Sequence, residues 1–302
     1  MIYEYALEPV LLNNWKDFRH FTEKFDFYQG RLISCYPKRW KRMVIESLSE
    51  KGPNRTKIVE RLKKLDDRML PGGREWRPEK DWLTNAEIAH GEGPFRAILA
   101  KDNPRGHNCV LLGDEVEEDT PLFRIEEAPS TRRLPQEVAN LVRPVLQIAK
   151  EILLIDPHFR PRKTEYQDMM GALLAAAVRE HTTPHPRVEI HTSDKLGTKC
   201  FSDEARKYLP RLIPEGMKVR LILWAVRDSN DRFHNRFILT DRGGLKLGDG
   251  IDEGKGRDEI SRFGKEWNTY DEQRQLYTKD KSIRTCTGEV EIVGTAKSPQ
   301  RR

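Results

Sequence analysis

A histidine, an arginine and an aspartate follow one another closely in residues 233–241, whose sequence is Phe-His-Asn-Arg-Phe-Ile-Leu-Thr-Asp. If this segment is a β-strand, His234 and Arg236 lie on the same face, because side chains alternate along a strand. Asp241 comes at its end and is followed by a turn signal, Arg-Gly-Gly. A short apolar stretch then leads to Gly-Asp-Gly at 248–250. The pattern is therefore His-x-Arg-x4-Asp followed by glycines.

These side chains are suited to phosphodiester chemistry. An imidazole can attack phosphorus and leave again, which splits a difficult displacement into two easier steps. Arginine is always charged and presents a fork of N–H donors, so Arg236 could hold non-bridging oxygens as negative charge builds up on them. The alternative for the same residues is a half-buried strand histidine beside an arginine, with Asp241 capping a turn.

The segments before this pattern alternate between apolar runs and helical patterns. Short apolar runs at 152–155, 187–192 and 218–226 are typical of buried strands. Helical patterns separate them at 165–179 and from Ser202 onward. This alternation predicts an α/β fold with a mostly parallel central sheet flanked by helices.

The pattern at 233–241 resembles the signature of the phospholipase D superfamily, His-x-Lys-x4-Asp followed by a segment with Gly and Ser. His234, Arg236 and Asp241 match the three motif positions, with Arg in place of Lys. Gly248 stands where the family has its first downstream glycine. A bare motif of this kind is a weak signal, and its place after a strand in an α/β unit strengthens it.

The resemblance covers about a third of the chain, residues 145–252, and excludes the first 130 residues. The βαβ layout before the motif, with an Asp-Pro pair that begins at Asp156, also resembles one superfamily repeat. The chain departs from the family pattern at Asp249 and Ile251, which replace the usual Ser and Asn. This departure leaves open an inactive, substrate-binding form of the fold.

The resemblance implies a phosphodiesterase that forms a phosphohistidine on His234. Arg236 and Gly248 would bind the phosphate, and Asp241 would orient an imidazole by accepting its second N–H. A second histidine must protonate the leaving oxygen, and water then attacks the phosphohistidine. The scheme requires no metal and no cofactor.

The second histidine has three candidate sources. In this superfamily two motif copies face each other across a twofold axis, so a chain with one copy is expected to form a homodimer in which two His234 side chains converge. A decayed internal duplication could instead supply His107, because residues 107–114 match the motif at His, Asn, an apolar triplet and Asp, although Cys109 takes the phosphate-binding position. His158 is the third candidate, since it follows the end of a strand where α/β proteins build sites.

A basic region with interleaved aromatic residues lies at 31–80. It holds 15 basic and 7 acidic side chains, a net charge of +8 against +6 for the whole chain. Such regions attract phosphate backbones, but an ordinary solvated helix face is an equal alternative, and the helical pattern there places Trp40 on one side with Met43 and Val44. The candidate nucleic-acid contacts are Lys38, Arg39, Trp40, Lys41 and Arg42.

The composition is that of a soluble globular protein, with 37% hydrophobic and 34% charged residues. No apolar run approaches the roughly 18 residues of a membrane span, and the first residues lack the features of a signal peptide. The cysteines are far apart, without a CxxC pair, and are expected to be reduced thiols: Cys35, Cys109, Cys200 and Cys286. We therefore expect a cytoplasmic protein.

Three regions are expected along the chain. Residues 1–130 form a mixed α+β N-terminal region that binds nucleic acid or is the decayed half-repeat. Residues 131–296 form the phospholipase D-like catalytic domain, and residues 297–302 a disordered tail.

The expected function is a metal-independent nuclease acting on DNA, because the sequence lacks a membrane anchor or a strongly amphipathic basic helix that would suit lipid. Similar nucleases with one Arg-variant motif often belong to restriction or anti-phage systems, so other subunits of a defence complex are expected partners. One rival is a metal-dependent restriction-type nuclease with Asp156, Glu189 and His191 as ligands, although their spacing is loose. The other rival is a nucleic-acid-binding subunit with a decayed site.

Overall fold

The computed structural model describes residues 1–49, 51–71, 73–178, 184–226, 236–264, 267–278, 282 and 284–297. The chain divides into two compact units, each of which is described by itself. The N-terminal unit is Ile2–Glu126, and the C-terminal unit is Glu127–Arg302 together with Met1. The division lies close to residue 130, where the sequence places the start of the α/β pattern.

A parallel sheet forms the centre of the N-terminal unit. Among the described residues its strand order is β3-β2-β1-β4-β5, and each neighbouring pair is parallel. Helices return the chain to the same edge between most of these strands, so this region is α/β and the expected mixed α+β arrangement was wrong. The strands are β1 (Tyr3–Leu7), β2 (Arg31–Ser34), β3 (Met69–Leu70), β4 (Ala97–Ala100) and β5 (Val110–Leu112).

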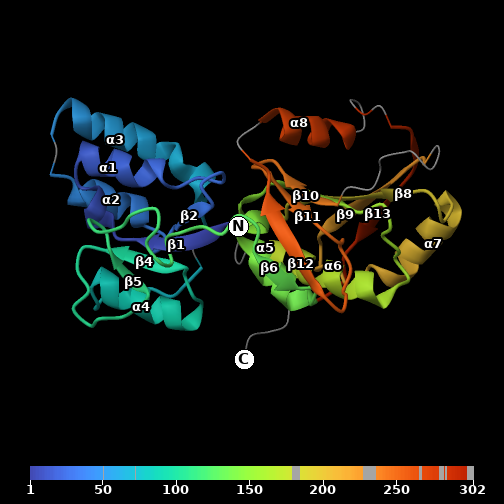
Figure 1. Cartoon of the computed structure of the whole chain (residues 1–302), viewed down its shortest axis with the longest axis horizontal. Helices are drawn as coiled ribbons and strands as arrows, with labels where there is room; N and C mark the ends of the chain where they lie inside the picture. The colour runs from blue at the N-terminus through green and yellow to red at the C-terminus, as the bar shows by residue number, and fades with distance from the viewer. Residues whose placement is uncertain are drawn as a thin grey trace. The chain divides into compact units, whose positions relative to one another are not determined.

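Helices cover both faces of this sheet (Figure 1). They are α1 (Trp15–Glu23), α2 (Trp40–Ser47), α3 (Pro53–Lys63) and α4 (Trp82–Glu92), with short 3-10 helices η1 (Pro9–Leu12) and η2 (Leu65–Arg68). Alternation along β1 gives each face its own core: Tyr5 and Leu7 pack beneath α1, α2 and α3, whereas Ala6 packs beneath α4. Asn14 and Asp81 cap α1 and α4 by accepting backbone N–H groups.

The C-terminal unit contains a mixed sheet in the order β13-β9-β8-β7-β10-β11-β12-β6. The pairs β7–β8 and β8–β9 are parallel, and the other neighbouring pairs are antiparallel. The expected mostly parallel sheet was therefore wrong for this unit, because the short turns between β10, β11 and β12 can join only antiparallel neighbours. The strands are β6 (Ser130–Arg132), β7 (Glu151–Ile155), β8 (Arg187–Ser193), β9 (Lys218–Trp224), β10 (Phe237–Thr240), β11 (Gly244–Leu247), β12 (Arg257–Arg262) and β13 (Cys286–Val293).

Helices also lie on both faces of the mixed sheet: α8 covers one face, and α5 and α6 pack together on the other (Figure 1). The helices are α5 (Pro135–Ile148), α6 (Thr164–Ala177), α7 (Thr198–Tyr208) and α8 (Trp267–Leu276). Pro135 starts α5, where a missing N–H costs nothing, and Pro144 lies inside the same helix. The predicted β-α-β-α-β order from 152 to 226 is present as β7, α6, β8, α7 and β9.

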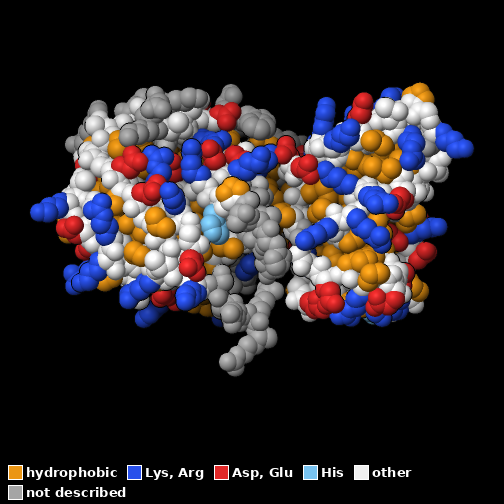
Figure 2. All heavy atoms as spheres, turned by 180° about the vertical axis from the view of Figure 1, so that it is seen from behind, with side chains coloured by type: hydrophobic (Ala, Val, Ile, Leu, Met, Phe, Trp, Pro, Cys, Tyr) orange, Lys and Arg blue, Asp and Glu red, His pale blue; other side chains and the backbone are white. Residues whose placement is uncertain are grey.

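Cationic and anionic side chains are interleaved over both units on the face drawn in Figure 2. On that face a surface for nucleic acid must therefore come from local clusters of cations. Among the described helices, none has the length and the apolar character needed to cross a membrane.

Candidate functional site at the carboxyl end of strand β7

The carboxyl end of β7 is where several of the candidate residues meet. β10 is antiparallel to β7, with Phe237 opposite Ile155, so Arg236 lies at the edge where β7 ends. β11 returns the chain to this edge, and the N–H of Leu247 donates to the carbonyl of Arg236 over 3.0 Å. The turn at 248–250 therefore comes back beside Arg236.

Asp156 connects two loops at this edge. It follows β7 directly and is only 1% exposed. Its Oδ1 accepts the N–H of His158 at 2.8 Å, and its Oδ2 accepts the N–H of Ile251 at 2.9 Å. Burial raises the pKa of Asp156, and these two N–H donors and the charge of Arg236 offset the increase only in part. One buried carboxylate thus ties the loop after β7 to the turn after β11.

Arg236 is half-buried beside this carboxylate. Its guanidinium forms no hydrogen bond or ion pair with any residue that the structure describes. Gly250 passes close to it with φ at +137°, and a Cβ there would lie 3.0 Å from Asp156 Oδ2 and 3.1 Å from Arg236 Cδ. Glycine suits both this backbone conformation and this close approach. Among the described residues, the arrangement leaves this cation without a hydrogen-bond or ion-pair partner, and such a cation can bind an anion.

Other charged and polar side chains at this edge have no place in the motif. Burial raises the pKa of Tyr166. The charges of Asp156 and Asp252 raise it further, and those of Arg236 and Arg160 lower it. Nη1 of Arg160 is buried without a hydrogen-bond partner among the described residues. Arg133 forms an ion pair with Asp252 in the turn after β11. Only the position of Arg160, shortly after the Asp-Pro pair at a strand end, could have indicated any of these residues from the sequence.

The two histidines expected at this site have different outcomes. His158 is brought to it: the residue is half-buried, and its charge lowers the pKa of Asp156. His234 precedes Arg236 by two residues and lies outside the described residues. Its role as the nucleophile therefore stays a prediction.

Gly248, expected to bind the phosphate, lies beside a carboxylate. The residue that lies closest to a Cβ at Gly248 is Asp258, through its carboxylate. The same carboxylate accepts the N–H of Asp249 at 3.1 Å. An anion already occupies the space beside Gly248, so phosphate binding there is not supported, and Gly250 is the glycine that approaches Arg236.

Asp241 lies at the opposite end of β10 from Arg236. Its Oδ1 accepts the backbone N–H groups of Lys150 and Glu151 at 2.7 and 3.1 Å, and its Oδ2 lies 3.3 Å from Arg242 Nε. This carboxylate therefore holds the start of β7 against the end of β10. The structure does not bring Asp241 to Arg236, and the expected part of Asp241 in one site with that residue is not supported.

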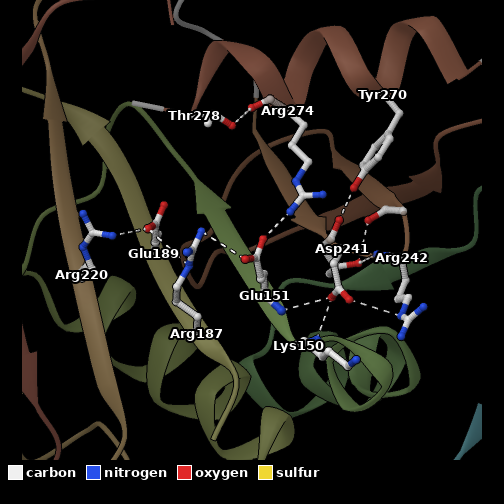
Figure 3. Close-up of polar contacts among 12 residues, drawn as sticks. Lys150, Glu151, Arg187, Glu189, Arg220, Asp241, Arg242, Tyr270, Arg274 and Thr278 are labelled. Atoms are coloured by element: carbon white, nitrogen blue, oxygen red, sulfur yellow. Dashed lines mark hydrogen bonds and ion pairs between the residues drawn. The ribbon is translucent and has the colours of Figure 1, made fainter. Parts of the chain in front are cut away.

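A separate network of ion pairs lies on the sheet face beneath α8 (Figure 3). Glu151 pairs with Arg274 and, at 3.3 Å, with Arg187, while Glu189 pairs with Arg220 at 2.9 Å. These residues line a cavity of about 480 Å³. Because each of these arginines already has a carboxylate partner, the cavity offers little net charge to a ligand.

The three ligands of the metal-dependent rival do not share a face of the sheet. Glu189 and His191 pair in register with Leu153 and Ile155, so they lie on the α8 face, whereas Asp156 has the opposite parity. Burial lowers the pKa of His191; burial alone would raise that of Glu189, but its contact with His191 and the charges of neighbouring arginines lower it. Within the described part of the chain, no group of three His, Cys, Asp or Glu side chains could hold a metal ion.

The basic segment at the start of α2 is mostly occupied by contacts within the protein. Trp40 is fully buried and its Nε1 donates to the carbonyl of Leu7 at 2.6 Å, so it cannot stack on a base. This outcome agrees with the helical pattern, which places Trp40 on the apolar side. The expected nucleic-acid contact through Trp40 was wrong.

The cations of the same segment differ in their partners. Lys41 and Arg42 are each 2.7 Å from a carboxylate, of Asp66 and Glu46 respectively. Lys38 and Arg39 are exposed, and the Arg39 guanidinium lies over the Trp76 ring. Two of the four expected phosphate-binding cations are therefore already neutralised.

His107 lies in the N-terminal unit, before edge strand β5. Its Nδ1 is 3.3 Å from Glu87 Oε1, and its side chain is half exposed. β5 is parallel to β4 at the edge of its sheet, whereas β10 is antiparallel to β7 in the interior of the other sheet. This difference in topology does not support an internal duplication.

Comparisons of the chain with family models, with curated proteins and with solved structures find no match.

Proposed function

We propose that this chain is a phosphodiesterase, a metal-independent nuclease that cleaves DNA through a phosphohistidine on His234. The observation that carries the proposal is the position of Arg236. Its guanidinium, without an ion-pair partner among the described residues, lies at the carboxyl edge of β7, and His234 precedes it by two residues. Ligand sites of α/β sheets are built at this edge.

The chemistry follows from the residue types. His234 attacks phosphorus, a P–N bond forms, and the P–O bond to the leaving alcohol breaks while a second histidine gives that oxygen a proton. Water then attacks phosphorus, the second histidine takes its proton, and the P–N bond breaks to release His234. Arg236 binds the non-bridging oxygens, whose charge grows in each transition state.

The surroundings of Arg236 support this role. Asp156 ties the loop that carries His158 to the turn that contains Gly250, and Gly250 lies beside Arg236. Arg160 adds a second cation: its charge and that of Arg236 both act on the hydroxyl of Tyr166. Two arginines near one point favour a substrate with a phosphate group over a neutral one.

The second histidine in this proposal comes from a second copy of the chain, with His158 as the alternative within one chain. Mixing His234→Ala subunits with wild-type subunits separates the two, because composite sites lose activity in mixed dimers and sites within one chain do not. DNA, rather than RNA or lipid, remains the proposed substrate. A place in a restriction or anti-phage system, with other subunits as partners, belongs to the same proposal.

The experiment that tests the function is hydrolysis of a labelled DNA and of a small aryl phosphodiester in excess chelator. The proposal expects turnover to persist in chelator and to disappear in His234→Ala. A restriction-type nuclease depends on a metal-activated water, so its activity would vanish in chelator and return with Mg²⁺. A binding subunit with a decayed site would retain DNA without cleaving it under either condition.

A further inference from the structure

Helices α1 and α3 of the N-terminal unit form a groove that the basic motif near α2 does not include. The groove has a volume of about 340 Å³. It is lined by Trp15, Lys57, Glu60, Arg61 and Lys64. Three of these five side chains are cations, and one is an aromatic ring.

The three cations lie on one side of α3 and its C-terminal cap. Lys57, Arg61 and Lys64 are spaced i, i+4 and i+7, which places them on one helical stripe. A second stripe, about 100° around the helix from the first, carries Ile58 and Leu62, both buried in the core of the unit. Amphipathic burial of α3 thus turns its cationic stripe toward solvent.

Trp15 fixes two of these cations. The Lys57 ammonium lies 5.7 Å and the Arg61 guanidinium 4.9 Å from the centre of the Trp15 ring. The ring is itself held by stacking on Phe18, with centroids 6.2 Å apart and planes at 11°. Cation–π contacts of this kind reduce the freedom of long side chains, so less entropy is lost when they bind a phosphate.

Within the described residues, the cations of this stripe have no carboxylate partners. Lys57, Arg61 and Lys64 form no ion pair with any residue in the described part of the chain. Lys41 and Arg42, in the segment that the sequence favoured, are each paired with a carboxylate. Glu60 is the single anion of the groove lining, which leaves this lining with a net charge of +2.

We propose that this groove binds the phosphate backbone of nucleic acid, with Lys57, Arg61 and Lys64 as the phosphate contacts and Trp15 as their platform. Along an α-helix, positions 57 to 64 span roughly 10 Å at about 1.5 Å per residue. Measured along the duplex axis, one strand carries about three phosphates over that length, at about 3.4 Å per charge, so the match requires α3 to lie along that axis. The stripe therefore matches a short run of one strand. The proposal rests on the nucleic-acid part of the proposed function and is independent of the phosphohistidine chemistry.

The test measures binding by the full-length chain that carries His234→Ala, so that cleavage cannot remove the probe. The probe is a fluorescent 20-base-pair DNA duplex, and its dissociation constant is followed against salt concentration. The Lys57→Gln, Arg61→Gln, Lys64→Gln triple variant should lower the log–log salt slope by about 0.9 for each lost contact. The matched control removes three cations of the same unit that are already paired, Lys41→Gln, Arg42→Gln and Arg105→Gln, and should leave the slope unchanged.

Two further variants test the direction in which the DNA affinity changes. Glu60→Gln removes the anion of the groove and should tighten DNA binding. Trp15→Leu keeps all three charges and should weaken binding about two- to fivefold, the magnitude of one exposed cation–π contact. Thermal melts of each variant establish that the N-terminal unit is folded.

Equal slopes for the triple variant and its control would overturn the proposal. So would binding of phosphatidylserine vesicles that competes with DNA and exceeds it, because the stripe would then be a membrane surface. The wild-type chain distinguishes this failure from failure of the proposed function. DNA that is bound through the groove but never cleaved contradicts only the phosphodiesterase, whereas cleavage and binding that are unchanged in the triple variant contradict only the groove.

Discussion

Arg236 and Asp241 lie at opposite ends of strand β10. Arg236 precedes Phe237, which pairs with Ile155 at the carboxyl end of β7, and Asp241 follows Thr240, which pairs with Ile152 near its start. The strand between them places the two Cα atoms roughly 16 Å apart, at about 3.3 Å per residue. The His-x-Arg-x4-Asp pattern therefore contains two parts. Arg236 lies in the candidate site, whereas Asp241 binds the backbone at the start of β7.

The first prediction separates these two parts. Arg236→Gln should lower kcat/KM for phosphodiester hydrolysis by about 10²–10³, the loss that follows removal of one donor to a transition-state oxyanion, with little change in stability. Asp241→Ala removes the acceptor of the Lys150 and Glu151 N–H groups and should lower the free energy of unfolding by about 2 kcal/mol. Steady-state kinetics and urea denaturation of both variants provide the measurement. An Asp241→Ala enzyme with wild-type stability and no activity would contradict the structural role.

The second prediction concerns the glycine that approaches Arg236. Gly250→Ala places a methyl group against Asp156 and Arg236 at a φ of +137°, so hydrolysis should fall at least about tenfold. Gly256→Ala is the matched control, since a Cβ at Gly256 meets no heavy atom within 4 Å. Comparable activities for the two variants would show that the turn after β11 has no part in the reaction.

The third prediction concerns the carboxylate that joins the two loops. Asp156→Asn keeps one acceptor oxygen but turns an amide N–H toward the N–H of His158 or Ile251. We expect a loss of about 1–3 kcal/mol in the free energy of unfolding, the cost of one unmade buried hydrogen bond, and a drop in kcat. Urea denaturation and single-turnover kinetics measure the two effects. The idea fails if the variant is as stable as the wild type.

The fourth prediction concerns pH. His191 is fully buried, and its Nδ1 accepts the Nε1–H of Trp224 at 3.1 Å. Because burial holds its pKa below the ordinary value, the stability it contributes is present above about pH 6.5 and is lost as pH falls toward the folded-state pKa, by up to about 1.4 kcal/mol per unit. Glu189, Arg220 and Tyr277 face this ring; burial alone would raise the pKa of Glu189, but its contact with His191 and the charges of neighbouring arginines hold it below the ordinary value.

His191→Asn isolates this contribution. Asparagine can still accept from Trp224 but does not titrate, so the variant should be less stable at pH 7 and should lose less stability on going to pH 5. The free energy of unfolding at both pH values, for both proteins, is the measurement. Parallel pH profiles would show that His191 does not set the acid limit of this unit.

Much of the α/β layout could be predicted from local patterns. The apolar run 152–155 corresponds to β7, and the helical pattern at 165–179 corresponds to α6. Helix α7 begins at Thr198, before the expected Ser202, and its first turn contains the buried Phe201. The antiparallel pairing of β10 with β7 joins residues more than 80 positions apart. A local pattern of apolar residues cannot predict such a pairing.

The candidate site was predictable at Arg236 and His158 but not at its other positions. The sequence pattern suggests that all of 233–241 lies at one site. A strand, however, places its first and last residues at opposite ends of the sheet, so Arg236 and Asp241 are separated. Asp156 was noted as part of an Asp-Pro pair, yet its link to Ile251 comes from folding. The cations of α3, which form no ion pair with the described residues, could not be told from the paired cations of α2, because both helices are basic and a partner such as Asp66 lies outside α2.

The most direct test of the central claim is to trap the covalent intermediate. The wild-type chain is mixed with excess DNA in the presence of chelator, quenched in alkali during turnover, and digested for mass spectrometry. The account predicts a phosphoryl-linked adduct on the peptide that contains His234, stable in alkali, lost in acid and missing from His234→Ala. Turnover without an adduct on this peptide, or an adduct on a different residue, would contradict the account.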